Sequence, residues 1–376
     1  MTKAAELAKM GEVLTNSQIG GRRNIVINGA MQVAQRGTST ASISSGNNFV
    51  LDRTRFQLSN GGTWTMSQST TVPTGQGFSN SLKLDCTAAD TSLGSSDYLL
   101  VQQVIEGQDV QQFAFGTSDA KSVTVSFWIR SNKTGTYTLE VQQQNSSSGF
   151  YQNAKTFTIS SANTWEKKEI TFVGNTSQNI INSNAIGFYV SIWLGTGTSR
   201  TSGTFTNGTW HNTTANRISS SNVNLADSTD NELYLTGLQL EVGEQATPFE
   251  HRSFGEELAL CQRYFERTEG VDSSARGVGG FTVGAGVWYA TNQLLAHFPF
   301  KQTKRAIPSI SVSASDAIKA YTGSSSAISA NDSSVCDAIG MNSARFNFTP
   351  ASSGTAGHGT LIQLQENDTI SVDAEL

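Results

Sequence analysis

The sequence predicts a mainly β protein, with an antiparallel jelly-roll sandwich, a second and smaller β-rich C-terminal domain, and short N-terminal and inter-domain helices. Apolar and polar residues alternate with a period of two over many short segments, which is typical of half-buried strands. Charged residues make up only 15% of the 376 residues, and 35 glycines supply tight turns. Helical spacing is confined to two short segments, so strands joined by turns account for most of the chain.

The composition excludes several functional classes. The formal net charge of -5 argues against a nucleic-acid binder, because phosphate contacts need clustered lysine and arginine. No apolar run approaches the ~18 residues that a membrane-spanning helix needs. The N-terminus lacks the apolar core of a signal peptide, so we expect the protein to be made in a reducing cytoplasm and not exported. Three widely spaced cysteines are expected to be buried apolar residues: Cys86, Cys261 and Cys336.

Changes in pattern divide the chain into four segments. Residues 1–36 are expected to form an N-terminal helix and strand for attachment or oligomerisation, and residues 37–250 the jelly roll. Residues 251–270 are expected to form a connector helix, and residues 271–376 the C-terminal β-sandwich domain. The first segment carries a short apolar stripe made of Leu7, Met10 and Leu14. This stripe predicts a helix that docks on the chain's own body or frays, or else bundles with copies of itself or anchors to a larger assembly.

Residues 22–48 contain a turn signal and a polar stretch. Asn28-Gly29 lies between two apolar runs and predicts a hairpin or turn. Residues 37–48 are rich in Ser, Thr, Gly and Asn, which indicates a loop or linker.

Strands are expected throughout residues 49–250. Two alternating runs, 123–130 and 137–141, flank the turn residues 132–135 and predict a β-hairpin. Alternation changes phase at Thr236-Gly237, which predicts a β-bulge. The other expected strands are short alternating runs at residues 82–86, 157–159, 170–172, 186–194 and 233–242.

The pattern becomes helical at Ser253. Ser253 and Glu256 have the spacing of a capping box, and the apolar residues Phe254, Leu258 and Phe265 then follow at helical spacing. We expect this helix to end near Arg267 and its apolar face to pack at a domain or subunit boundary, so these three residues are candidates for oligomerisation. Strands are expected again at residues 281–289, 292–300, 306–314, 344–348, 359–364 and 368–374, with a long polar loop at 322–334.

No catalytic motif or cofactor site is recognisable, and no catalytic residue is assigned. The four histidines lack metal-ligand spacing, and no nucleophile elbow or phosphate-binding loop occurs. Asp227, Asp230 and Glu232 lie within six residues of one another. They are expected to be solvated loop carboxylates, with a structural Ca²⁺ as the alternative.

A sugar-binding surface is the one site that the strand pattern suggests. The residues that alternate with the apolar positions include aromatic, amide and charged side chains, and flat rings stack on sugar C–H faces while polar groups bond hydroxyls. The alternative is that this face packs on a loop, a neighbouring domain or another subunit, and Trp210 is similarly expected to anchor a loop. The candidate residues are Trp128, Arg130, Glu140, Gln142, Tyr189 and Trp193.

Two segments resemble a known family. Residues 22–37 (RRNIVINGAMQVAQRG) and 236–265 (TGLQLEVGEQATPFEHRSFGEELALCQRYF) are similar to those of virion fibre or tail-fibre proteins of tailed bacteriophages, especially phages of marine bacteria. The resemblance implies an N-terminal attachment segment, a jelly roll like that of carbohydrate-binding modules, and a β-rich tip. It also implies a homotrimer located in the virion that contacts the host surface.

Three functions remain open at the level of sequence. The first is a non-enzymatic, homotrimeric tail fibre that contacts other virion proteins through its N-terminus and binds host-surface glycan, without nucleic-acid binding or membrane insertion. The second is a purely structural virion component, such as a head fibre, decoration or adaptor protein, in which Trp128 and Trp193 are buried against protein. The third is a polysaccharide-degrading tailspike, which needs a cleft with paired carboxylates.

Overall fold

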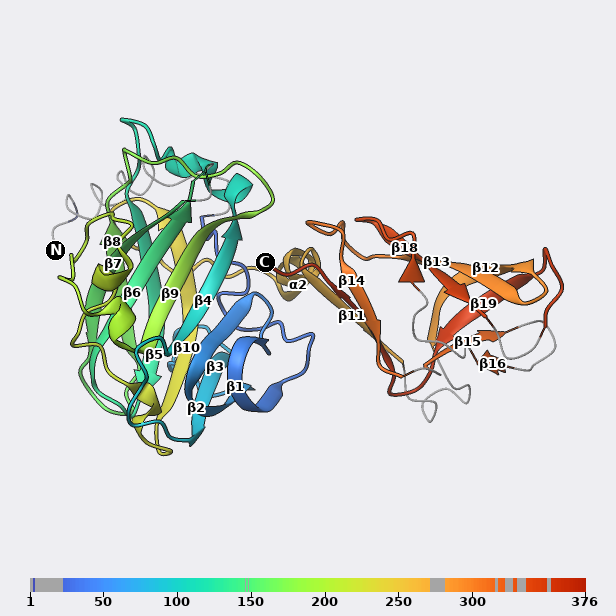
Figure 1. Cartoon of the computed structure of the whole chain (residues 1–376), viewed down its shortest axis with the longest axis horizontal. Coiled ribbons are helices and arrows are strands. Elements are labelled where there is room, and N and C mark those ends of the chain that lie inside the picture. Colours follow the sequence, from blue (N-terminus) through green and yellow to red (C-terminus); the bar gives the residue numbers. More distant parts are fainter. Residues whose placement is uncertain are drawn as a thin grey trace. The chain divides into compact units, whose positions relative to one another are not determined.

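The computed structural model describes Lys3 and residues 23–145, 147, 149–270, 281–314, 317–321, 327–329, 336–349 and 353–376. It is mainly β, as the sequence predicts, and divides into two compact units, residues 1–257 and 258–375 (Figure 1). The expected N-terminal helix with Leu7, Met10 and Leu14 lies outside the described residues. Within the described residues, no helix has both the length and the apolar character needed to cross a membrane.

The first unit is an antiparallel sheet of ten strands that folds into two layers. Its strand order is β7-β6-β9-β4-β2-β3-β10-β5-β8, and β1 pairs with β2 outside this path. The strands are β1 (Ser39–Phe49), β2 (Thr54–Ser69), β3 (Ser81–Ala88), β4 (Tyr98–Glu106), β5 (Val123–Ser131), β6 (Gly135–Gln144), β7 (Phe150–Ile159), β8 (Glu166–Phe172), β9 (Ile186–Thr196) and β10 (Glu232–Val242). Four 3-10 helices join them: η1 (Gly107–Phe113), η2 (Thr198–Arg200), η3 (Thr214–Asn216) and η4 (Leu225–Asp227).

Strand β2 belongs to both layers. Its first half, Thr54–Ser59, pairs with β4, and its second half, Thr63–Ser69, pairs with β3. Asn60, Gly61 and Gly62 between the halves have φ values of 55°, 85° and 82° and interrupt the extended chain. A Cβ on Gly62 would lie 2.4 Å from a backbone oxygen of β3, so glycine is required there. The interruption separates a β6–β9 layer (β7, β6, β9, β4 and the first half of β2) from a β5–β10 layer (the second half of β2, β3, β10, β5 and β8).

One hydrophobic core lies between the two layers. Phe127 in β5 and Val190 and Ile192 in β9 are all at most 2% exposed, and their neighbours in sequence point outward. Phe127 contacts Phe157 of β7 across the core, with ring centroids 5.4 Å apart. The period-two alternation of the sequence therefore reflects one face of each strand packed against the opposite layer.

Two local expectations in the first unit are wrong. Strands β5 and β6 do not form a hairpin, because β5 pairs with β10 and β8 while β6 pairs with β7 and β9. The short connection between them crosses from one layer to the other, which lets both apolar faces enter the same core. Residues 37–48 are not a loop, since β1 pairs with β2 over most of this stretch. Only Ile43 is buried in β1, so this paired edge strand has the polar composition of a linker.

The turn at Asn28-Gly29 is confirmed, although the strands of the expected hairpin are absent from residues 23–36. Asn28 has a φ of 61°, and its side-chain oxygen accepts hydrogen bonds from the backbone N–H groups of Gln32 and Val33, at 2.9 and 3.0 Å. The segment runs beside β10 instead, where the N–H of Ile25 donates to Leu240 O at 3.0 Å.

The β-bulge in β10 is also confirmed. The pairing of β10 with β5 shifts register between Thr236 and Gln239, and Gly237 has a φ of 65°. The bulge lets Leu233 and Leu235 on one side of it, and Leu238 and Leu240 on the other, all reach the core.

Helix α2 (Phe254–Gln262) begins where the sequence predicts. The backbone N–H of Glu256 lies 3.3 Å from Ser253 Oγ, as expected for an N-cap. The helix ends earlier than expected, because Phe265 starts strand β11 (Phe265–Glu269) and pairs with Asp373 of β20. Burial of Phe265 to 4% exposure in the second unit outweighs the helical spacing of the local sequence.

The second unit contains two antiparallel sheets. One has the order β11-β20-β14 and the other β16-β15-β19-β12-β13-β18-β17. The six expected C-terminal strands correspond to β12, β13, β14, β18, β19 and β20, whereas the expected loop 322–334 lies outside the described residues except for β16. The remaining bounds are β12 (Phe281–Ala290), β13 (Gln293–Pro299), β14 (Ser309–Val312), β15 (Ile318–Tyr321), β16 (Ala327–Ser329), β17 (Cys336–Asp337), β18 (Ser343–Phe348), β19 (Gly359–Leu364) and β20 (Thr369–Asp373).

Candidate functional site

The six residues expected to bind sugar do not form one surface. Trp128 and Arg130 lie on β5, on the outer face of the β5–β10 layer. The other four lie on β6 and β9, which pair with each other in the β6–β9 layer: Glu140, Gln142, Tyr189 and Trp193. The expectation of a single platform is wrong because it depended on the hairpin between β5 and β6.

The outer face of the β6–β9 layer is covered by chain. We call residues 197–224 the cover segment. It forms isolated bridges to β6 and β7, at Thr136–Asn222, Gln152–His211 and Ala154–Asn207. Ile218 of this segment packs with Leu100 and Trp193 in a small cluster of buried residues.

A buried ion pair fixes the cover segment to the sheet. Glu140 is 0% exposed and accepts hydrogen bonds from Trp193 Nε1 at 3.0 Å and from Arg217 Nη2 at 2.7 Å. Arg217 Cζ also lies 5.0 Å from the centre of the Trp193 ring. Burial lowers the pKa of Arg217, but the Glu140 carboxylate outweighs this effect and raises the pKa overall. Glu140 and Trp193, which is 1% exposed, therefore anchor the cover segment and do not present a sugar-binding surface.

Gln142 and Tyr189 lie at the edge of this covered face. Gln142 is 8% exposed, and its Oε1 accepts a hydrogen bond from Arg217 Nη2 at 3.3 Å. The half-buried Tyr189 ring lies 6.2 Å from the ring of Phe150, which is 41% exposed. Burial raises the pKa of Tyr189, while the nearby Arg55 and Arg217 oppose this shift. This edge of the covered face therefore offers an aromatic surface to solvent.

The outer face of the β5–β10 layer is covered only in part, because Thr236, Gln239 and Glu241 are buried while Trp128, Arg130 and Trp165 are half-buried. Strand register places Tyr234 of β10 opposite Arg130, and Lys167 of β8 opposite Trp128. Trp165 precedes β8 and lies 6.2 Å from Tyr234 between ring centroids, at an interplanar angle of 63°. The side chains of Lys167 and Glu169 on this face are 38% and 47% exposed. We call the group formed by Trp128, Arg130, Trp165 and Tyr234 the open aromatic face.

Fixed polar groups surround these rings. Arg130 Cζ lies 4.9 Å from the centre of the Tyr234 ring, and Arg130 Nε donates a hydrogen bond to Asn163 O at 2.9 Å. The Tyr234 hydroxyl donates to Glu232 Oε2 at 3.0 Å, and Lys83 lies 3.1 Å from the same carboxylate. The indole N–H groups of Trp128 and Trp165 have no hydrogen-bond partner in the described part of the chain. This arrangement can stack a sugar ring and bond its hydroxyls.

Half of this face can be predicted from the sequence. Trp128 and Arg130 were identified from their alternation with apolar residues of β5. Tyr234 was missed although it alternates with Leu233 and Leu235 in the same way. Trp165 precedes its strand, so alternation gives no signal for it, and only the pairing of β8 with β5 brings it to the face.

The structure does not support the calcium alternative. Asp227 pairs with Lys133 at 2.5 Å, whereas Glu232 bonds Lys83 and Tyr234. Among the residues that the structure describes, no group of three or more metal-binding side chains converges. By contrast, Trp210 anchors its loop as expected, with Nε1 donating to Val173 O at 2.7 Å and its ring against Phe115.

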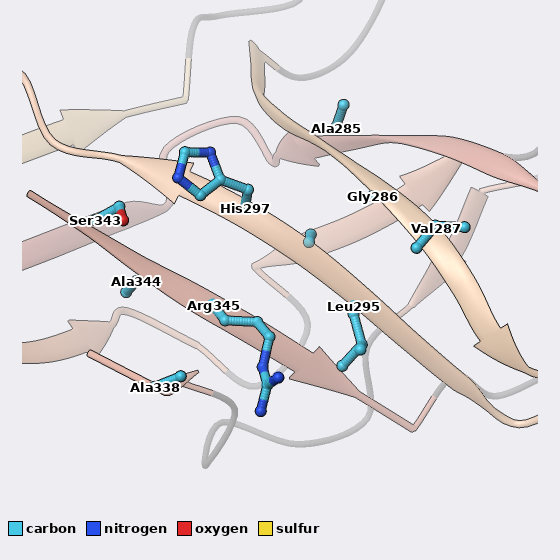
Figure 2. Close-up of a pocket in the computed structure, with 10 residues that line it drawn as sticks. Ala285, Gly286, Val287, Leu295, His297, Ala338, Ser343, Ala344 and Arg345 are labelled. Carbon is cyan, nitrogen blue, oxygen red and sulfur yellow. The ribbon is translucent and has the colours of Figure 1, made fainter. Parts of the chain in front are cut away.

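The second unit has a shallow groove on one face of its larger sheet. The groove has a volume of about 470 Å³ and crosses β12, β13 and β18, and its lining includes small residues such as Gly286 and Ala344 (Figure 2). Val287 and Leu295 line it together with His297 and Arg345. Arg345 is already paired with Asp337, through hydrogen bonds of 2.6 and 2.9 Å.

The three candidate oligomerisation residues near helix α2 are not equivalent. Phe254 is 57% exposed and Leu258 is half-buried, so both remain candidates. The expectation for Phe265 is wrong, because this residue lies on β11 in the core of the second unit.

Comparisons with known proteins find likeness at the level of structure alone. No family model and no curated protein matches the sequence. The enzymatically active domain of tailspike protein 4 of bacteriophage CBA120 is similar at 12% identity and a TM-score of 0.31, over 58% of this chain and 21% of that chain. A family 22 carbohydrate-binding module of Clostridium thermocellum Xyn10B has 11% identity and a TM-score of 0.30, over 56% and 98% of the two chains.

A third similar structure is a xylan-binding family 22 module from Paenibacillus barcinonensis, with 13% identity and a TM-score of 0.28, over 58% and 98% of the two chains. This chain spans only about a fifth of the tailspike chain's length. At these values the likenesses carry no argument about function. The assignment to a β-sandwich of jelly-roll type rests on the strand pairing described above.

Proposed function

We propose that this chain is a non-enzymatic fibre protein of a bacteriophage particle, and that its first unit binds host-surface glycan through the open aromatic face. The observation that carries the proposal is that Trp128 and Trp165, both half-buried, lie on the same sheet face as Tyr234, whose ring supports a fixed guanidinium. The virion location rests on the resemblance of residues 22–37 and 236–265 to phage fibre proteins.

The contrast between the two outer faces supports this choice of site. A sugar ring needs an accessible aromatic surface with hydrogen-bonding groups beside it. On the β6–β9 layer, the Trp193 ring and the Glu140 carboxylate expected to serve this purpose are buried under the cover segment. On the β5–β10 layer, Trp128, Arg130 and Trp165 are half-buried and partly reached by solvent, whereas Tyr234 is 7% exposed; the two indole donors lack a partner within the described residues.

A glycan array of bacterial surface oligosaccharides, probed with the purified full chain, tests the proposal. We expect binding that Trp128→Ala and Trp165→Ala each weaken about five- to a hundredfold, since stacking of a ligand ring on an aromatic side chain contributes about 1–3 kcal/mol. Phe150→Ala, which removes an exposed ring from the other layer, is the matched control and should leave binding unchanged. Binding that is insensitive to both tryptophans would refute this site.

A purely structural role in the particle is the second candidate. It is favoured by the burial of Trp193, which that role predicts. It also predicts burial of Trp128 against another protein, and in the isolated chain Trp128 is half-buried. The location of the chain in an intact particle separates the two candidates: a distal position supports glycan binding, and enclosure between other virion proteins supports architecture.

The proposal includes a homotrimer and the absence of catalysis. Light scattering of the purified chain should give three times the monomer mass of 40.2 kDa. A well-folded monomer at micromolar concentration would contradict the fibre assignment. Incubation with a bound polysaccharide should release no reducing sugar, and release would support the tailspike alternative.

A further inference from the structure

Arg130 is held in a fixed orientation at the centre of the open aromatic face. Its guanidinium stacks on Tyr234 at 4.9 Å, and its Nε is bonded to the backbone oxygen of Asn163 at 2.9 Å. Both contacts use the face and the Nε side of the guanidinium. The two Nη groups therefore remain as a planar pair of donors, which make no hydrogen bond within the described residues.

Arg130 also differs from the other cations of this face in its charge balance. Lys83 lies 3.1 Å from both Asp85 and Glu232, and Lys167 lies 2.6 Å from Glu169. Arg130 forms no ion pair with any carboxylate in the part of the chain that the structure describes. A planar guanidinium with two aligned donors matches the two oxygens of a carboxylate, and its rigid support lowers the entropy lost on binding.

We propose that the open aromatic face recognises glycans that carry a carboxylate, such as uronic acids, and that Arg130 binds this carboxylate through its Nη groups. Trp165 and Arg130 both lie against the Tyr234 ring, at 6.2 Å between ring centroids and at 4.9 Å, so a sugar that stacks on the indole places its ring substituents near the guanidinium. This inference rests on the proposed function and adds the chemical class of the ligand.

The test compares an acidic oligosaccharide that is bound on the array with its carboxyl-reduced counterpart, by titration with the full chain. We expect the acidic form to bind about ten- to a hundredfold more tightly, as charge-assisted bidentate pairs contribute about 1.5–3 kcal/mol. Arg130→Gln should abolish this difference while binding of the neutral form persists. Arg130→Lys, which keeps the charge but loses the fork, should restore only part of it.

Arg345→Gln is the matched control, because it removes the same charge from an exposed arginine of the second unit and should leave both affinities unchanged. Equal affinity for the acidic and reduced forms, unaffected by Arg130→Gln, would overturn this inference and leave the proposed function intact. If Trp128→Ala lost all binding while Arg130→Gln kept the affinity for the acidic glycan unchanged, this inference would also be overturned and the proposed function would stand. A chain that binds no glycan on the array would overturn the proposed function, and this inference with it.

Discussion

Replacing Glu140 with glutamine tests whether a buried charge fixes the cover segment to the sheet. Glutamine has the same shape and can still accept a hydrogen bond from Trp193 Nε1, which now lies 3.0 Å from the carboxylate. The change removes the only counter-ion that the described residues place against Arg217, whose side chain is 18% exposed. Arg217 would then remain charged and largely desolvated beside the Trp193 ring.

The expected loss follows from this geometry. Removing one partner of a buried pair destabilises a protein by about 3–5 kcal/mol. The retained hydrogen bond to Trp193 and the partial exposure of Arg217 place Glu140→Gln at the lower end, about 3 kcal/mol. For a unit of this size, such a loss lowers the melting temperature by roughly 6–12 °C.

Urea denaturation followed by tryptophan fluorescence measures the effect, because five of the six tryptophans lie in the first unit. Glu169→Gln is the matched control, since it breaks a pair with Lys167 whose partners are 47% and 38% exposed, and should change stability by less than about 1 kcal/mol. A Glu140→Gln variant as stable as this control would refute the view that the ion pair anchors the cover segment. A double variant, Glu140→Gln with Arg217→Met, should recover part of the loss.

Three further predictions concern the fold and the thiols. Gly237→Ala should destabilise the first unit by about 1–3 kcal/mol in the same urea assay. Gly237 has a φ of 65°, and the added Cβ would lie 2.6 Å from Phe78 Cζ. Unchanged stability would contradict the bulge geometry. Asn28→Ala should lower the free energy of unfolding by about 2–4 kcal/mol, because the buried Asn28 side chain makes four hydrogen bonds at the turn. A loss below about 1 kcal/mol would contradict the view that these hydrogen bonds hold the turn. Burial raises the pKa of the Cys86 thiol from 9.0 to about 11, so the unfolded chain loses this proton at lower pH than the native chain. The free energy of unfolding should therefore fall as the pH rises from 9 to 11, and Cys86→Ala should remove this pH dependence.

Alternation and turn chemistry predicted much of the fold. Strand β9 could be predicted because apolar residues recur at every second position of its sequence, and the bulge at Gly237 because this alternation changes phase there. The N-terminus of α2 followed from Ser253 and the helical spacing after it. These features depend on residues that are close together in the chain, so they can be predicted from the sequence.

Features that depend on pairing between distant residues were missed. The hairpin at β5 and β6 looked correct locally, but crossing between the layers buries both apolar faces. β1 has one buried residue and pairs only at an edge, so its composition is that of a loop. The burial of Trp193 depends on Ile218 and Arg217, which follow it by more than twenty residues and carry no strand pattern.

The candidate site likewise has one part that local sequence predicts and another that depends on distant pairing. The outward position of Trp128 could be read from β5 alone, whereas its grouping with Trp165 and Tyr234 depends on the order β10-β5-β8. The alternation within one strand predicts which face of the sheet a residue occupies. The order of the strands determines which residues share that face.

Hydroxyl-radical footprinting of the full chain, with and without a glycan that it binds, tests the central claim most directly. We expect Trp128 and Trp165, which are reached by solvent in the free chain, to be oxidised there and protected when the glycan is bound. Trp193, at 1% exposure, should remain unreactive in both samples and serves as the internal control. Protection of Phe150 or of the cover segment, with Trp128 and Trp165 oxidised equally in both samples, would contradict the account.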